Sequence, residues 1–316
     1  MPEGRKRDSP FAGMMRPNRS HMSNATSRFR KALPWVAFAL ACLLWHSSWR
    51  WPAPALAVNG PVLPPAFDVS TPRQDNRFRI AIFNIHRGRD RNGRFALERT
   101  AETLEGFDLI GLHEVVGPTF FGQSDQAHLL GQSLNMAAAF LPVQRRFYRD
   151  YQGNGLLSRF PIEQWRSQPL PLRARHHRHR GISTCVVRIG EIALTVMITH
   201  LDNGIDRYRQ LAIALEQFRQ HDRAILIGDF NTTRNDPQLR LALNSYADDA
   251  IGKHLGDEDI PGRVDWILTR GLRTRAAGIR DLDASDHPCF WIEIELDAPV
   301  RLTENSLEDT IATNSP

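Results

Sequence analysis

The sequence contains little cysteine. Its 316 residues include three, Cys42, Cys185 and Cys289. Three cysteines at these distances match no zinc-binding pattern and cannot build a disulfide framework. A Cys185–Cys289 disulfide would require an oxidising compartment. Two free buried thiols are the simpler expectation, because unpaired cysteine is among the most buried residue types.

Long hydrophobic runs are also absent. The apolar run at residues 32–45 would span only about 21 Å as a helix, against about 30 Å for a bilayer core. Basic residues precede the run and a small-residue triplet ends at Ala57, a pattern typical of an export signal cleaved after Ala57. The alternative is an uncleaved signal anchor, associated with the membrane through residues 32–51. We therefore expect a periplasmic or extracellular protein if the leader is cleaved. If it is retained, we expect a membrane-anchored protein whose remaining chain lies outside the cytoplasm.

Excess positive charge is confined to the front of the chain. A net charge of +5 and a pI of about 9.5 would by themselves suggest a nucleic-acid-binding protein. Residues 1–76 carry a net +6, however, and residues 77–316 carry −1. The basicity of the whole chain therefore gives no indication of what the larger part binds.

Composition divides the chain into four segments. Residues 1–57 form the leader, and the prolines of residues 58–76 predict a linker. Residues 77–297 are long enough for one large domain with a full core. Residues 298–316 are polar and are predicted to be a disordered tail.

The predicted domain mixes strands and helices throughout. Apolar helical periodicity predicts helices over residues 95–104 and about 208–218. Short apolar or alternating runs predict strands at residues 77–84, 108–112, 155–157, 182–189, 192–199, 224–227, 264–268 and 290–296. This mixture indicates α/β layers around a buried sheet.

Polar side chains recur where these strands begin or end. Any one of them could simply turn the chain, but their joint placement favours a site built on a rigid scaffold. These residues are Asn84, Glu114, His200, Asp229, Asn231, Asp265, Asp286 and His287.

Their sequence context resembles a known family. The ordered motifs are FNIH (83–86), LIGLHEV (109–115), GNGLLSRFPI (153–162), THLD (199–202), GDFN (228–231), VDWIL (264–268) and SDH (285–287). Together they resemble the endonuclease/exonuclease/phosphatase superfamily. The resemblance implies a four-layered α/β sandwich, with two face-to-face mixed sheets flanked by helices and one active site at the top of the sheets.

The resemblance also implies a divalent-metal site. Asn84, Glu114 and Asp286 are similar in position to the family's ligands for Mg²⁺, for which Mn²⁺ should substitute. Their side chains supply oxygen atoms, the ligands that a hard cation prefers. The family usually has glutamine before the metal-binding glutamate, and here that residue is His113.

Catalytic roles follow from the same resemblance. Asp229 resembles the carboxylate that orients and deprotonates the attacking water, and Asn231 the amide beside it. His287 is similar to the histidine that contacts the phosphate, with Asp265 orienting its ring. His200 would be a second donor to the phosphoryl oxygens, and no acidic partner for it can be identified from the sequence.

A run of arginine and histidine at residues 173–180 precedes one predicted strand. Arg178 and Arg180 could gather phosphate at the site, because arginine binds phosphate bidentately. An exposed basic loop is an equally simple reading, and support for a zinc site is weak. Asn154 could add a hydrogen bond near the metal, or could serve only in a Gly-Asn-Gly turn.

These observations favour an Mg²⁺-dependent phosphodiesterase or nuclease-type hydrolase acting outside the cytoplasm. Its substrate would be a phosphodiester, either nucleic acid or a phospholipid head group, and no protein partner is predicted. One alternative is a phosphomonoesterase of the inositol-phosphatase type, for which no basic phosphate-specific motif is found. Another is a membrane-tethered binding module without activity, against which the filled metal and histidine positions argue.

Overall fold

The computed structural model describes residues 20–65, 76–119, 122–173, 178–256 and 260–296. The chain divides into two compact units, Met1–Ser48 and Trp49–Pro316. In the first unit, the described residues form helix α1 (Ser20–Ser48), which contains the apolar run. Within the described ranges, no helix has both the length and the apolar character needed to cross a membrane.

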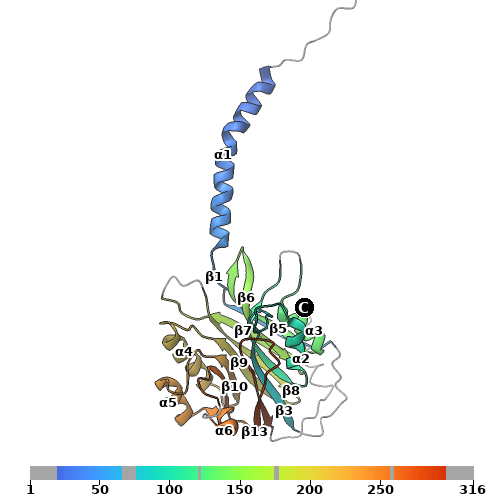
Figure 1. Cartoon of the computed structure of the whole chain (residues 1–316), viewed down its shortest axis with the longest axis vertical. Helices are drawn as coiled ribbons and strands as arrows, with labels where there is room; N and C mark the ends of the chain where they lie inside the picture. The colour runs from blue at the N-terminus through green and yellow to red at the C-terminus, as the bar shows by residue number, and fades with distance from the viewer. Residues whose placement is uncertain (1–19, 66–75, 120–121, 174–177, 257–259, 297–316) are drawn as a thin grey trace, which may run out of the picture. The chain divides into compact units, whose positions relative to one another are not determined.

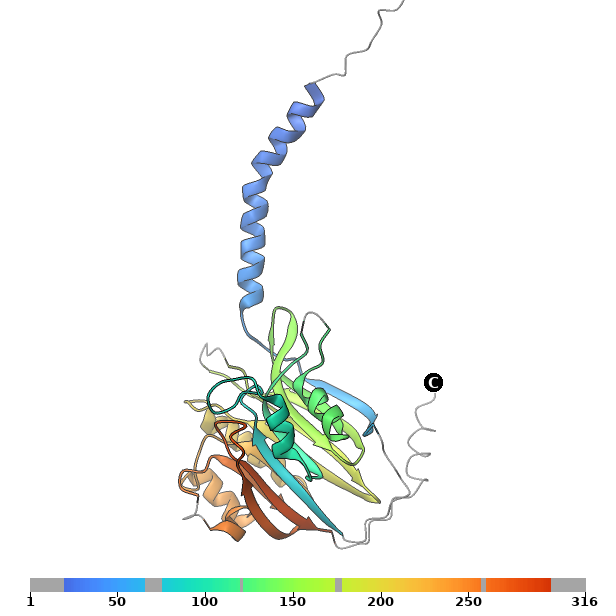
Figure 2. The same cartoon turned by 45° about the vertical axis from the view of Figure 1, so that its right-hand side comes forward.

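The second unit contains two seven-stranded mixed sheets (Figure 1). The first has the order β1 (Trp51–Pro52), β5 (Ala137–Arg146), β6 (Arg149–Ser158), β4 (Leu109–Val116), β3 (Arg77–Asn84), β14 (Cys289–Glu295) and β13 (Arg273–Arg280). The second has the order β11 (Asp248–Asp249), β12 (Asp265–Arg270), β10 (Ala224–Asp229), β9 (Ile192–His200), β8 (Gly181–Ile189), β7 (Ile162–Pro169) and β2 (Leu56–Val62). Strand β14 pairs with β3, so strands from both ends of this unit lie side by side (Figure 2).

Helices cover the outer faces of the sheets. One core cluster joins the facing sides of the two sheets, a second lies beneath helices α2 and α3, and a third beneath α4 and α5. The helices of this unit are α2 (Leu97–Leu104), α3 (Gln126–Leu134), α4 (Arg207–Arg219), α5 (Pro237–Ser245) and α6 (Gly252–Leu255). The predicted four-layered α/β sandwich is therefore confirmed.

Strand β3 shows why its sequence becomes apolar after two exposed arginines, Arg77 and Arg79. Phe78, Ile80 and Ile82 point into the core between the sheets. The alternate residues Ala81 and Phe83 face α2 and α3 on the other side. Side chains alternate across a strand, so a strand covered on both faces needs apolar residues at every position. Burial of each larger side chain stabilises the fold by about 1.5–3 kcal/mol.

The predicted elements with a continuous apolar pattern are present. The strand predicted at residues 77–84 coincides with β3, and the helix predicted from residue 95 begins at Leu97. The prediction missed β1, β2, β5, β7, β11, β13, α3, α5 and α6. The β13 sequence carries three arginines and is mostly part-exposed, which hides its pattern. Helix α5 did carry a signal, because Asp236 caps it immediately before a proline at its first turn.

The linker predicted at residues 58–76 differs from the structure at its beginning. Residues up to Val62 belong to β2, which pairs with β7. Pro64 and Pro65 follow β2, and residues 66–75 lie outside the described residues, as does the predicted tail at 298–316.

Cys185 and Cys289 are free and buried, and they lie in different core clusters. The expectation of two free buried thiols is therefore confirmed. Burial raises the pKa of both thiols, so neither forms a reactive thiolate at neutral pH.

Candidate active site

The polar side chains at the strand ends gather at one edge of the sandwich. Asp229 ends β10, in register with His200 at the end of β9 and with Asp265 at the start of β12. Asn84 ends β3 in the other sheet, and its side-chain nitrogen donates to Oδ2 of Asp229 at 3.2 Å. This hydrogen bond places the ends of both sheets at a common site, as predicted from the strand-end pattern.

Asp229 is the most buried carboxylate of the site, with 2 % of its surface exposed. The backbone N–H of Asn231 donates to its Oδ1 at 3.1 Å, and Nε2 of His200 lies 3.3 Å from its Oδ2. Asp229 is thus the acidic neighbour of His200 that the sequence did not reveal. Asn231 has a left-handed backbone, φ 49°, and its side chain donates to the Leu201 carbonyl.

His287 and Asp265 form a second hydrogen-bonded pair at the site. Nδ1 of His287 donates to Oδ2 of Asp265 at 2.7 Å, as the predicted Asp–His pairing requires. The buried Ser285, which the prediction did not single out, anchors this loop. Its hydroxyl donates to the Asn84 carbonyl at 2.6 Å and accepts the backbone N–H of His287 at 3.3 Å. Only its place in the SDH motif hinted at this role.

Burial and neighbouring charges move the pKa values of Asp229 and His287 to opposite sides of neutral pH. Burial raises the pKa of Asp229 to about 6, and the negative charge of Asp265 adds to the increase. For His287, burial lowers the pKa, but the hydrogen bond and charge of Asp265 and the charges of Asp229 and Asp286 together raise it to about 9. At neutral pH, Asp229 is therefore mainly a carboxylate and His287 an imidazolium. Such a pair supplies one base and one acid.

Asp229, Asp265 and His287 can also hold a divalent metal ion. One ligand atom from each residue lies within 4.8 Å of the other two. Two carboxylates and an imidazole fit a divalent cation. A metal bound by His287 would have to displace a proton from its raised-pKa imidazole.

Glu114 reaches the site through a strained backbone. It has φ 58°, in the left-handed region, at a register shift between Leu112 and Val115 in the pairing of β4 with β6. His86 and Arg87 also have positive φ. Non-glycine residues rarely adopt this conformation, and such residues cluster at functional sites. The bulge redirects the Glu114 side chain at the end of β4, where Arg87 Nε lies 3.5 Å from its Oε2.

The predicted metal ligands Asn84, Glu114 and Asp286 offer oxygen donors at this edge. The Oδ1 atom of Asn84 accepts the backbone N–H of His86 at 3.2 Å. The ring of His86, the last residue of the FNIH motif, has Nδ1 3.5 Å from Oδ1 of Asp286. The chemistry of these three side chains fits Mg²⁺, and their role as the ligand set stays a prediction.

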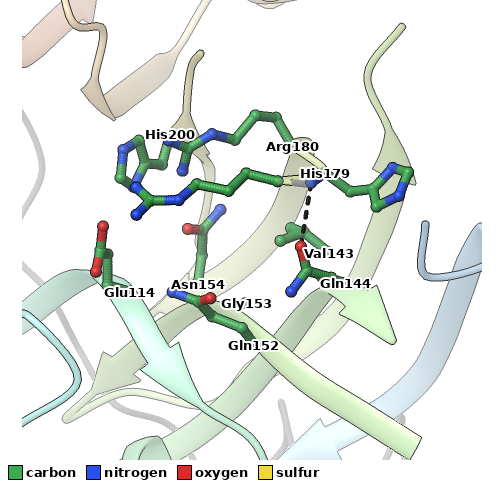
Figure 3. Close-up of a pocket in the computed structure, with 10 residues that line it drawn as sticks. Glu114, Val143, Gln144, Gln152, Gly153, Asn154, His179, Arg180 and His200 are labelled. Carbon is green, nitrogen blue, oxygen red and sulfur yellow. Dashed lines mark hydrogen bonds between the residues drawn. The ribbon is translucent and has the colours of Figure 1, made fainter. Parts of the chain in front are cut away.

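A small pocket adjoins Glu114 and His200 (Figure 3). Its lining includes Asn154, Arg178 and Arg180. The Arg180 side chain extends from the start of β8 towards His200, above Asn154 and Glu114. Nδ2 of Asn154 and Nε of Arg180 are buried and have no hydrogen-bond partner in the structure. The pocket therefore presents two unused donors beside a carboxylate, an arrangement suited to an anion.

The structure decides two sequence alternatives at this pocket. Asn154 lies within β6 and is 2 % exposed, so the proposed turn is wrong. Arg180 is 8 % exposed, whereas Arg173 and Arg178 are exposed, as the basic-loop alternative expects. Desolvation by burial lowers the pKa of Arg180, against the charges of Glu114 and Asp229. Residues 174–177 of the basic run lie outside the described residues.

His113, the residue in place of the usual glutamine, is fully buried behind the site. Its ring meets the His200 ring nearly perpendicularly, with centroids 5.8 Å apart. Burial lowers the pKa of His113 to about 3 and lowers the pKa of His200, with Arg180 adding to the second effect. Both rings are therefore neutral at pH 7.

Comparison with known proteins agrees with this geometry. The model of the Endonuclease/Exonuclease/phosphatase family matches residues 81–287, more than half of the chain. The chain belongs to this family and is a phosphoesterase of the hydrolase class. No curated protein matches it.

Solved structures show the same fold at low sequence identity. The endonuclease/exonuclease/phosphatase from Beutenbergia cavernae is 21 % identical with a TM-score of 0.54, covering 71 % of this chain and 72 % of that one. A family protein from Leptotrichia buccalis is 16 % identical with a TM-score of 0.54, covering 69 % and 100 %. D. rerio TDP2, complexed with a single-strand DNA product, is 17 % identical with a TM-score of 0.51, covering 70 % and 100 %.

Proposed function

We propose that this protein is a divalent-metal-dependent phosphodiesterase that acts outside the cytoplasm. The observation that carries the proposal is the pair of opposed acid–base groups, Asp229 with a pKa of about 6 and His287 with a pKa of about 9. Phosphoester hydrolysis needs a base to take a proton from water and donors for the negative phosphoryl oxygens.

Asp229 is the base in this scheme. Asn84 and Asn231 hold its two oxygens through hydrogen bonds, which keeps the carboxylate fixed while it accepts a proton. His287 stays protonated because Asp265 accepts the hydrogen bond from its Nδ1. This leaves Nε2 of His287 to donate to the phosphate, either to a phosphoryl oxygen or to the departing oxygen.

Arg180 and Asn154 would bind the phosphate itself. Both residues line the pocket beside Glu114 and His200, and each has a buried donor without a hydrogen-bond partner. Neutral His200 adds a donor without adding charge. An anion entering the pocket would replace the hydrogen bonds that these buried groups otherwise lack, which stabilises the complex.

Mg²⁺ completes the proposed site. Asn84, Glu114 and Asp286 would hold it, since they offer oxygen atoms and stay separate from the His287–Asp265 hydrogen bond. The ion would neutralise charge developing on the phosphoryl oxygens. Mn²⁺ should substitute because it accepts the same oxygen ligands.

The substrate in this proposal is a phosphodiester of nucleic acid or of a phospholipid head group. The fold shared with D. rerio TDP2, solved with a single-strand DNA product, supports the nucleic-acid class. Action outside the cytoplasm is supported by the basic flank and apolar run of the leader.

The test is hydrolysis of bis-p-nitrophenyl phosphate by the full chain with Mg²⁺ or Mn²⁺. We expect activity that EDTA abolishes, and a loss of at least about 10²-fold in kcat for Asp229→Ala and for His287→Ala. The exposed Asp222→Ala variant is the matched control. Wild-type rates in both site variants would contradict the proposal. A panel of plasmid DNA, RNA, sphingomyelin, phosphatidylinositol and inositol phosphates then separates the substrate classes and identifies a monoesterase.

A further inference from the structure

One short segment that begins within the predicted leader joins both sheets. Residues 51–52 form β1, which pairs with β5 at the edge of the first sheet. Four residues later the chain enters β2, which pairs with β7 at the edge of the second sheet. Residues 50–62, which we call the strap, thus supply the edge strand of both sheets, β1 beside β5 and β2 beside β7.

The strap is held by specific contacts. The N–H of Ala53 donates to the Val143 carbonyl of β5 at 2.9 Å, and Ala53 is 2 % exposed. Leu56 and Val58 are in register with Ser167 and Trp165 of β7. Residue Val62 packs against the core between the sheets. Without the strap, β5 and β7 would become exposed edges with unpaired backbone groups.

The strap also touches the segment that enters the phosphate pocket. Nε2 of His179 lies 3.1 Å from the Arg50 carbonyl and donates to it. The N–H of His179 donates to Oε1 of Gln144 at 3.2 Å, and Gln144 is in register with Pro52 of β1. Arg178 and Arg180, the neighbours of His179, line the pocket. In Figure 3 the His179 ring points away from Glu114, while the Arg180 side chain reaches towards His200.

We propose that the strap is a permanent part of the enzyme and that His179 is a positioning residue for its arginines. His179 fixes the backbone between Arg178 and Arg180 by bonding to the strap on the side opposite the phosphate. Any cleavage near the N-terminus must then occur before Arg50, and not after Ala57 at the end of the predicted leader. Cleavage after Ala57 would cut β2 in two, remove β1 and delete the Arg50 carbonyl to which His179 donates.

The first test is the N-terminus of the enzyme purified from the cells that produce it. Intact-mass and N-terminal peptide measurements should place the first residue at or before Arg50. A first residue after Arg50, such as Val58, would overturn the proposal. This result is independent of the substrate and of any activity.

The second test concerns His179 and uses the full chain. Hydrogen–deuterium exchange should show slow exchange at Ala53 in the wild type and faster exchange of residues 50–53 and 178–181 in His179→Leu. The His179→Gln variant keeps a donor and should restore protection. The His254→Leu variant is the control, because His254 lies in α6 and its ring contacts Thr274 of β13, at the opposite edge of the first sheet from β1. Unchanged exchange in His179→Leu would contradict the anchoring role of His179. Fast exchange at Ala53 in the wild type would contradict the permanent pairing of the strap.

The positioning role rests on the proposed phosphodiesterase function and has its own readout. With bis-p-nitrophenyl phosphate, His179→Leu should raise KM about fivefold or more, the scale of one lost hydrogen bond. Its kcat should stay within about twofold of the wild type. His179→Gln should recover the wild-type KM. A fall in kcat at constant KM would reject positioning. A wild type that cleaves no phosphodiester would reject the proposed function. The exchange and N-terminus measurements would still show whether the strap is a permanent part of the protein.

Discussion

Nδ1 of His287 lies 2.7 Å from Oδ2 of Asp265, and Asp265 is in backbone register with Asp229 on the neighbouring strand. The imidazole is therefore held against two carboxylates at the same level of the sheet. This arrangement gives the site a proton donor that persists at neutral pH.

Asp265→Asn should move the alkaline limb of the pH–rate profile. The raised pKa of His287, about 9, depends on the Asp265 hydrogen bond and charge. In the proposed scheme activity requires the protonated imidazole, so kcat/KM should fall as pH rises through this pKa. Losing the Asp265 charge should move that fall to lower pH by about 1–3 units. The profile of kcat/KM between pH 6 and 10 measures it, with Asp222→Asn as the control. An unshifted limb would mean that another group sets it.

Glu114→Gln should weaken metal binding. We expect at least a tenfold loss of Mn²⁺ affinity, on the order of the loss caused by changing a supporting residue of a metal site. Titration calorimetry on the full chain measures this without substrate. His287→Ala should keep the wild-type affinity if Glu114 is a ligand. The reverse result would place the ion on Asp229, Asp265 and His287, whose ligand atoms lie within 4.8 Å of one another.

Arg180→Ala should raise KM for a phosphodiester by roughly tenfold or more. A hydrogen bond to a charged group contributes about 1.5–3 kcal/mol, and 1.4 kcal/mol corresponds to tenfold in affinity. Arg180→Lys should recover only part of this, since lysine lacks the planar fork of arginine. Arg209→Ala, on the exposed face of α4, is the matched control. An unchanged KM in folded Arg180→Ala would exclude the pocket as the phosphate site.

His113→Gln should make the fold less sensitive to acid. The folded-state pKa of His113 is lowered to about 3 by burial, whereas the unfolded chain takes up a proton near pH 6.5. Between these values the unfolded state binds more protons, so stability falls as pH falls below about 6.5. The contribution reaches about 3 kcal/mol at pH 4.

Urea unfolding at pH 7 and pH 4 tests this prediction. His113→Gln should lose less free energy of unfolding between these pH values than the wild type does. The loss does not vanish, because the buried His200 also has a lowered pKa. An equal loss in the two proteins would show that His113 is not the buried base responsible.

Two kinds of element differ in how well the sequence reveals them. Strand β3 is buried on both faces from Ile80 onwards, so its residues there are apolar up to Asn84 at its end, and this run reveals the strand. Strand β13 carries Arg273 and Arg275 and is largely part-exposed. Its pairing with β14, the next strand along the chain, is therefore not indicated by an apolar pattern in β13 itself.

The sequence by itself determined the family, the layered fold and the residue types at the strand ends. These features are local, since each motif combines a buried strand with the polar residue that follows it. Only the tertiary structure decided that Asp229 contacts His200 and Asn84, that Arg180 is buried beside Asn154, and that residues 50–62 belong to the folded unit. Distances, burial and pKa values depend on which segments lie close together in space. Pairing between strands that are far apart in the sequence determines which segments those are.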